Sequence, residues 1–184
     1  VFTGAFDPRL SFLMKPSGDG TYNGLEPGRG ETVLATTKRP PNFWGHFATS
    51  APAGGVDTGA RSYYKNNSLF PILTYSQMQF IKAEAAFKKN DKATAFTAYK
   101  AGIAGSFDHL KKYYTGYTAI TDAARNTFLA TPSIDPGDAN SLTLSMIMLQ
   151  KFVALWPWNP NETWVDLRKY DYSSTVYTNW TMPT

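Results

Sequence analysis

The stretch FPILTYSQMQFIKAEAAFKKNDKATAFTAYKAGIAGSFDHL, residues 70–110, decides the fold of this chain. It contains two helical patterns separated by Asn90, and each begins with a side chain that can cap a helix N-terminus. Thr74 precedes the first pattern, and Gln77 stands three residues later as the partner of a capping box. Asp91 opens the second pattern. We therefore expect two consecutive helices joined by a tight turn.

The second pattern has one apolar side and one side of small residues. Apolar side chains recur at helical spacing along the first side: Phe96, Tyr99, Ile103, Phe107 and Leu110. Small residues fill the other side: Ala98, Ala101, Gly102 and Gly105. Such a face lets another backbone approach closely, which offsets the intrinsic cost of glycine in a helix, about 1 kcal/mol each. The two helices are predicted to form an antiparallel hairpin of the tetratricopeptide kind, buried by stacking on further pairs.

The first pattern is apolar on two sides of the helical wheel. The two groups are Tyr75, Met78, Ile81 and Ala85 on one side, and Phe80, Ala83 and Phe87 on the other. An all-round apolar helix is typical of buried positions. We therefore expect this helix to be packed between neighbours.

Three more helices are predicted within the helical part, residues 71–184. One should run from Thr118 to Leu129, because Pro132 follows. The next should begin near Asp138 or Asn140. The last has a three-part N-terminal signature, with Asn159 as cap, Pro160 at the first position and Glu162 at the third.

Residues 1–70 differ in character, because Gly and Pro recur in SGDGTYNGLEPGRG, KRPPNFWG and APAGGVDTG. The many aromatic residues of this segment argue against disorder. We expect ordered loops that lie over the helical part and carry a ligand face, with at most a short hairpin among residues 9–34. The whole is predicted to be one mainly α domain, and we interpret it as part of a longer chain.

The bulk composition excludes several functions. The net charge of +4 comes from 18 basic and 14 acidic residues without basic clusters, so nucleic acid is not an expected partner. Cysteine is absent, which excludes disulfides, thiolate nucleophiles and cysteine-based zinc sites. No segment of the sequence is apolar enough to span a bilayer.

No catalytic constellation is visible in the sequence. His46 and His109 lie far apart without metal-ligand spacing around either. Glu84 lies within an apolar helix, and Asp166 and Arg168 follow in WVDLRKYDY. A buried acid near an arginine is more often a structural ion pair than an acid catalyst, and we expect Glu84 and Arg168 to hold helices together. We predict no catalytic residue, no metal site and no cofactor.

Two aromatic loops carry the signal for ligand binding. Sugar-binding sites pair flat aromatic rings with amide, guanidinium or imidazole groups, because a pyranose has an apolar face and a fringe of hydroxyls. NFWGHF at residues 42–47 and RSYYKNN at residues 61–67 supply both kinds of group. The predicted ligand-binding residues are Phe43, Trp44, His46, Arg61, Tyr63 and Tyr64. The alternative is that Phe43 and Phe47 only fill the core.

Three landmarks in order resemble the SusD/RagB-like family of nutrient-binding outer-membrane lipoproteins. They are DPRL at residues 7–10 followed by GTYNGLEPG at 20–28, the helix pair at 70–110, and NPNETWVDLRKYDY at 159–172. The sequence departs from the family pattern at Lys169, where a second Arg is common. It also lacks the family's N-terminal half, with its signal and lipidated Cys, and its closing Arg-x-x-Tyr-Pro segment.

The resemblance implies a helical protein on the bacterial cell surface, attached to the outer membrane through an N-terminal lipid anchor absent from this sequence. It implies non-catalytic binding of oligosaccharide, or of peptide in RagB-like members, for delivery to a SusC-like TonB-dependent transporter. The alternatives are a helical scaffold that docks a protein partner and, with less support, a glycoside hydrolase.

Overall fold

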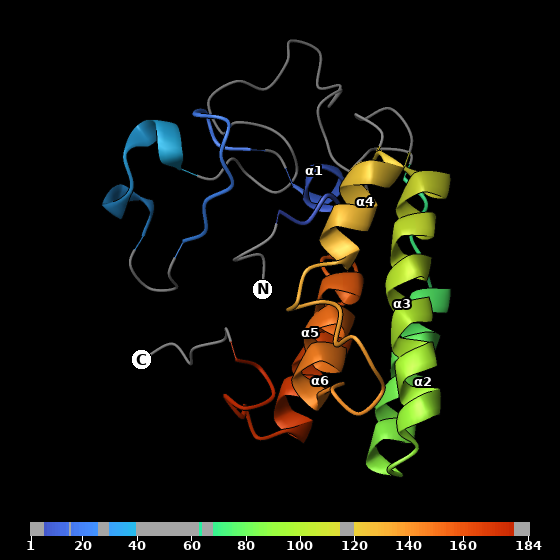
Figure 1. Cartoon of the computed structure of the whole chain (residues 1–184). Helices are drawn as coiled ribbons and strands as arrows, with labels where there is room; N and C mark the ends of the chain where they lie inside the picture. Colours follow the sequence, from blue (N-terminus) through green and yellow to red (C-terminus); the bar gives the residue numbers. More distant parts are fainter. Residues whose placement is uncertain are drawn as a thin grey trace.

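The computed structural model describes residues 6–14, 16–25, 30–39, 63, 68–114 and 120–178. Its secondary structure in these residues is entirely helical, which confirms the mainly α prediction, and no strand occurs in the described parts of 9–34. The helices are α1 (Leu10–Leu13), α2 (Tyr75–Lys88), α3 (Lys92–Tyr113), α4 (Asp122–Leu129), α5 (Leu144–Leu155) and α6 (Pro160–Lys169). Two short 3₁₀ helices, Glu31–Val33 and Thr36–Lys38, stand apart from the bundle (Figure 1).

The helices α2 and α3 form the predicted antiparallel hairpin and lie side by side along their length (Figure 1). Thr74 Oγ1 accepts a hydrogen bond from the Gln77 backbone N–H at 3.1 Å, and Asp91 Oδ1 accepts one from that of Thr94 at 3.0 Å. Both predicted N-caps are therefore confirmed. The return bond of the capping box is not, because Gln77 Oε1 is buried without a partner among the described residues.

The small-residue side of α3 is occupied by rings. A Cβ at Gly102 would lie 2.9 Å from the Phe80 ring, and one at Gly105 would lie 2.7 Å from the Tyr75 ring. The Ser76 hydroxyl also donates to the Gly102 carbonyl at 2.7 Å. The two glycines thus let α2 pack closely through aromatic side chains, where the sequence suggested backbone contact alone.

The start of α5 was predicted too early. Asp138 accepts hydrogen bonds from the backbone of Asn140 at 2.7 Å and Ser141 at 2.9 Å, but these close a turn. The helix begins after Thr143, whose hydroxyl accepts from Met146 N at 3.2 Å. The signature at α6 is confirmed, with Asn159 accepting from Glu162 N and Pro160 in the first turn. For α4 the cap is Thr121, and residues 118 and 119 of the predicted helix lie outside the described residues.

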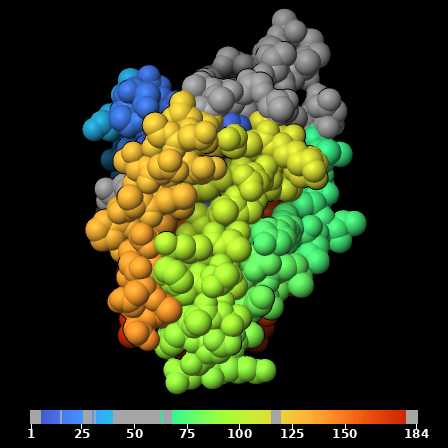
Figure 2. All heavy atoms as spheres, turned by 45° about the vertical axis from the view of Figure 1, so that its right-hand side comes forward, coloured from blue at the N-terminus to red at the C-terminus, as the bar shows by residue number. Residues whose placement is uncertain are grey.

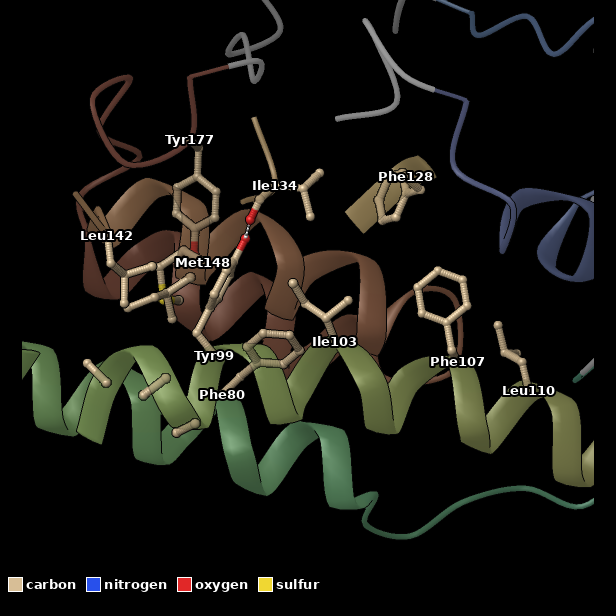
Figure 3. Close-up of a cluster of buried hydrophobic side chains, with 14 of the residues drawn as sticks. Phe80, Tyr99, Ile103, Phe107, Leu110, Phe128, Ile134, Leu142, Met148 and Tyr177 are labelled. Carbon is tan, nitrogen blue, oxygen red and sulfur yellow. Dashed lines mark hydrogen bonds between the residues drawn. The ribbon is translucent and has the colours of Figure 1, made fainter. Parts of the chain in front are cut away.

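The core lies between α3, α5 and the segment that joins α4 to α5 (Figure 3). The predicted stripe of α3 faces this core, and Tyr99 donates its hydroxyl to the Ile134 carbonyl at 2.7 Å. Phe107 packs edge-on against Phe128, with ring centroids 6.0 Å apart. Phe96 is the exception in the stripe, because it is only partly buried.

The helix α2 is buried on one side only, contrary to the prediction that it is packed between neighbours. Phe80 and Ala83 are fully buried against α3 and α5. On the other side Tyr75 is 61% exposed, Met78 48% and Ile81 41%. The helical pattern therefore identified the two apolar sides of α2, but it did not predict which side the fold covers.

Arg9 fixes the N-terminal segment to the helices. Its guanidinium is fully buried and pairs with the Asp7 carboxylate at 2.6 Å. It also donates to Ser106 Oγ on α3 at 3.2 Å and lies 5.0 Å from the Phe107 ring centroid. Figure 1 shows α1, which follows Arg9, at the end of the bundle beside α4. The residues that resembled a family motif in the sequence thus form a buried clamp.

A second buried group of charges joins α2, α5 and α6. Lys151 Nζ lies 2.7 Å from Asp166 Oδ2 and 3.7 Å from Glu84 Oε2. Glu84 also accepts hydrogen bonds from Lys169 and the Tyr170 hydroxyl. We call Glu84, Lys151, Asp166, Lys169 and Tyr170 the charged cluster.

The expected Glu84–Arg168 pair is wrong. Arg168 lies on the exposed side of α6 over the Trp164 ring, and Lys169 and Lys151 take its predicted place. Glu84 was correctly assigned a structural role, but its partner on α6 is Lys169, one residue after the predicted Arg168.

Candidate functional site

A cleft opens where the chain enters α2 and α3 comes to its end. Its volume is about 470 Å³, within the range of small-molecule sites. One wall is the segment 69–75, and the other is the last two turns of α3 with Tyr114. We call this the aromatic cleft.

The walls of the aromatic cleft present aromatic rings to solvent. Phe70 is 67% exposed, Tyr75 61% and Tyr113 44%. Exposed aromatic side chains that gather around one hollow are typical of binding sites. The cleft therefore has flat apolar surfaces that a ligand can cover.

Contacts with the helices fix both walls of the cleft. The Tyr114 hydroxyl donates to the Leu69 carbonyl at 2.7 Å, which ties the incoming segment to the end of α3. Phe70 packs edge-on against Trp158 with centroids 6.3 Å apart. Tyr75 lies on Gly105, where no larger residue leaves room for its ring. The rings are thus held in place before any ligand arrives, which lowers the entropic cost of binding.

Polar groups of three kinds also line the cleft: Asp108, His109 and Lys112. The Lys112 ammonium lies 5.1 Å from the Tyr113 ring centroid. Asp108 makes no ion pair with any described residue, although Lys112 is one helical turn away. A carboxylate and an ammonium with free hydrogen-bonding capacity are available to a polar ligand.

His109 lies between the cleft and the core. Its ring is 5.0 Å from that of Tyr113 and 5.6 Å from that of Tyr114, centroid to centroid. Burial lowers the pKa of His109, so the imidazole is neutral at pH 7. Its Nε2 is buried with no hydrogen-bond partner among the described residues.

Tyr63 is the one predicted ligand-binding residue that the structure describes. It is partly buried beside the aromatic cleft, with its ring 6.3 Å from that of His109 and 4.7 Å from that of Tyr114. Burial raises the pKa of its hydroxyl, as it raises that of Tyr114 to about 12. Both phenols are therefore neutral donors. The remaining predicted residues, Phe43, Trp44, His46, Arg61 and Tyr64, lie outside the described residues.

No separate signal in the sequence marks Phe70, Tyr75 and Tyr113 as exposed. Each lies in or next to a helical pattern, where an aromatic residue usually fills the core. Only their exposure in the folded structure shows that these rings remain outside the core. The His109 position was noticed, but only as a lone histidine without metal-ligand spacing.

The arrangement favours binding over chemistry. Rings with carboxylate, ammonium and imidazole groups beside them suit a ligand that has both apolar faces and hydroxyls. No set of three or more potential metal ligands converges in the described residues. None of the described helices has both the length and the apolar character needed to cross a membrane.

Comparison with known proteins gives one match. A family described as starch-binding and associating with the outer membrane matches residues 2–182, nearly the whole chain. No curated protein and no solved structure is similar at a significant level.

Proposed function

Since this chain belongs to the SusD-like family, we propose that it binds an extracellular oligosaccharide at the bacterial outer membrane without converting it. Starch binding and association with the outer membrane are properties of the family as described. The aromatic cleft is the observation that supports a site in this chain, because Phe70, Tyr75 and Tyr113 are exposed around one hollow.

The cleft suits carbohydrate for a physical reason. The apolar face of a pyranose covers an aromatic ring, while its equatorial hydroxyls need hydrogen-bond partners at the edge. Tyr113 supplies a ring, and Asp108 and Lys112 on the adjacent turns supply an acceptor and donors. Neutral His109 adds an imidazole at the base of the cleft.

We extend this proposal to the cellular context of the family. The protein is a surface-exposed lipoprotein that passes its ligand to a SusC-like TonB-dependent transporter. The loop residues Phe43, Trp44, His46, Arg61 and Tyr64, with Tyr63, form the rest of the ligand face. The position of Tyr63 against His109 supports this, because it brings one residue of that set next to the cleft.

A panel of soluble oligosaccharides tests the proposal by calorimetry. We expect one or more of them to bind and the sugar to be recovered unchanged by chromatography. Tyr113→Ala should weaken binding about 10-fold to 100-fold, the usual range for loss of a stacking residue. Ile81→Ala is the matched control, because Ile81 is similarly exposed but does not line the cleft.

Other results separate the alternatives. Cleaved sugar would indicate a hydrolase. Binding of peptides but of no sugar would indicate a RagB-like function. Absence of any small ligand, with copurification of a barrel transporter, would favour a docking scaffold.

A further inference from the structure

A second hollow lies away from the aromatic cleft, between the end of α5 and the outer side of α6. Its volume is about 370 Å³. Its lining includes Trp156, Pro157, Thr163 and Trp164. We call it the tryptophan hollow.

Trp164 is the unusual residue of this hollow. Its side chain is 53% exposed, although tryptophan is among the costliest side chains to leave in water. It lies in the middle of α6, which is anchored by the buried residues Asp166 and Leu167. The helix is therefore fixed in an orientation that leaves this indole accessible beside a hollow.

A cation lies next to the indole, and no acid in the described part of the chain pairs with it. The guanidinium carbon of Arg168 is 4.6 Å from the centre of the Trp164 ring. No described carboxylate lies within ion-pairing distance of Arg168. A guanidinium has five N–H donors, so most remain available to a ligand. Stacking holds the guanidinium over one face of the indole.

The hollow also has a hydroxyl and a rigid frame. Thr163 Oγ1 donates to the Asn159 carbonyl at 3.4 Å, which leaves its lone pairs able to accept a hydrogen bond. The Trp158 indole donates to the Ala154 carbonyl at 3.0 Å and fixes the link between the two helices. Little reorganisation is therefore needed when a ligand enters.

We propose that the tryptophan hollow is a second carbohydrate-binding site, in which a sugar ring packs against the part of the Trp164 indole that Arg168 leaves open and its hydroxyls accept hydrogen bonds from Arg168. An exposed indole, an adjacent guanidinium with free donors and a hydroxyl acceptor are the groups that a pyranose requires. The site is distinct from the aromatic cleft, because the two share no lining residue. The inference rests on the proposed function only for the class of ligand.

The indole N–H resonances of the full chain, observed by ¹⁵N NMR, provide the test. The probes are maltohexaose, cellohexaose, xylohexaose and mannohexaose, each titrated into the wild type and into Tyr113→Ala. We expect the Trp164 resonance to shift with at least one probe in both proteins. Trp164→Ala should lower the number of sugars bound by one or weaken the binding about tenfold or more.

Val165→Ala is the matched control, because Val165 is 52% exposed on the same turn and does not line the hollow. It should bind like the wild type. A circular dichroism melt of each variant shows that a lost response is not lost folding.

The outcomes distinguish this inference from the proposed function. If a sugar binds and Tyr113→Ala weakens it while the Trp164 resonance stays fixed, the second site is wrong and the cleft stands. If no sugar binds, both fail. If a proline-rich decapeptide moves the Trp164 resonance and no sugar does, the hollow is a peptide groove and the inference is overturned.

Discussion

The Arg9 guanidinium donates to Gln150 Oε1 at 2.9 Å, joining residues 141 positions apart in the sequence. Gln150 is a buried residue of α5, and the same guanidinium reaches Ser106 of α3. One side chain from the N-terminal segment thus connects α3 and α5. Figure 2 shows α3 at the surface of the molecule.

Arg9→Met should lower the free energy of unfolding by about 3 to 5 kcal/mol, because it leaves the Asp7 carboxylate buried without its cation. Urea denaturation followed by circular dichroism measures the change. The double variant Arg9→Met/Asp7→Leu removes both charges, and its free energy of unfolding should fall clearly less than that of the single variant. A double variant as unstable as the single one would show that the guanidinium contacts to Ser106 and Gln150 matter more than the ion pair.

Phe107→Ala should also be costly, about 3 to 5 kcal/mol, because it removes a fully buried ring that contacts both Phe128 and Arg9. Thermal and urea unfolding give the value. Tyr113→Ala, on the exposed last turn of the same helix, serves as the control and should change stability by about 0.5 kcal/mol or less. Equal losses in the two variants would mean that the buried side of α3 is misassigned.

The charged cluster makes stability depend on pH through Glu84. Burial alone would raise the pKa of Glu84, but hydrogen bonds from Lys169 and Tyr170 and the charge of Lys151 outweigh it and hold the pKa below 4.5. A carboxyl group whose pKa is lower in the folded state than in the unfolded state stabilises the fold when the pH is above its unfolded-state pKa. This stabilisation is lost as the pH falls through its folded-state pKa. Asp166 acts in the opposite sense, because burial raises its pKa in spite of Lys151.

Glu84→Gln isolates the contribution of Glu84 to the pH dependence, since Asp166 is present in both the wild type and the variant. The variant should be less stable by about 1 to 3 kcal/mol near neutral pH. The difference between wild type and variant should be complete above about pH 6 and shrink as the pH falls below 4.5. Urea unfolding midpoints of both proteins, measured from pH 6 down to pH 3, give the stability difference as a function of pH. A constant difference would show that Glu84 stays ionised throughout.

Trp44→Ala tests the loop part of the ligand face. It should weaken oligosaccharide binding by about 1 to 3 kcal/mol and leave the thermal midpoint nearly unchanged, as expected of a stacking residue. Calorimetry on the full-length protein measures the affinity. Unchanged affinity would remove Trp44 from the site, and a large fall in the midpoint would place its ring in the core.

Local signals in the sequence predicted the helices well. Thr74, Asp91 and Asn159 each cap the helix that the sequence assigned to them, because a cap depends only on the next three residues. The start of α5 was missed because Asp138 and Thr143 are both good caps. Only the surrounding packing shows that Asp138 closes a turn.

Long-range partners could not be predicted in the same way. On α6 the charge partner of Glu84 is Lys169 and not its neighbour Arg168, and the rotation of the helix decides between them. The aromatic cleft was missed for a similar reason. Whether Tyr75 or Phe80 faces solvent depends on which side of α2 the fold covers, since both sides are apolar.

The segment between Leu13 and Leu69 is fastened at both of its ends, since Leu13 is buried beside the Arg9 clamp and Leu69 is held by the Tyr114 hydroxyl. Doubling the length of a flexible connection between fixed ends costs only about 0.6 kcal/mol. The proposed loop residues of the ligand face lie between these two points, so their sequence can change in length and chemistry at little cost to the helices.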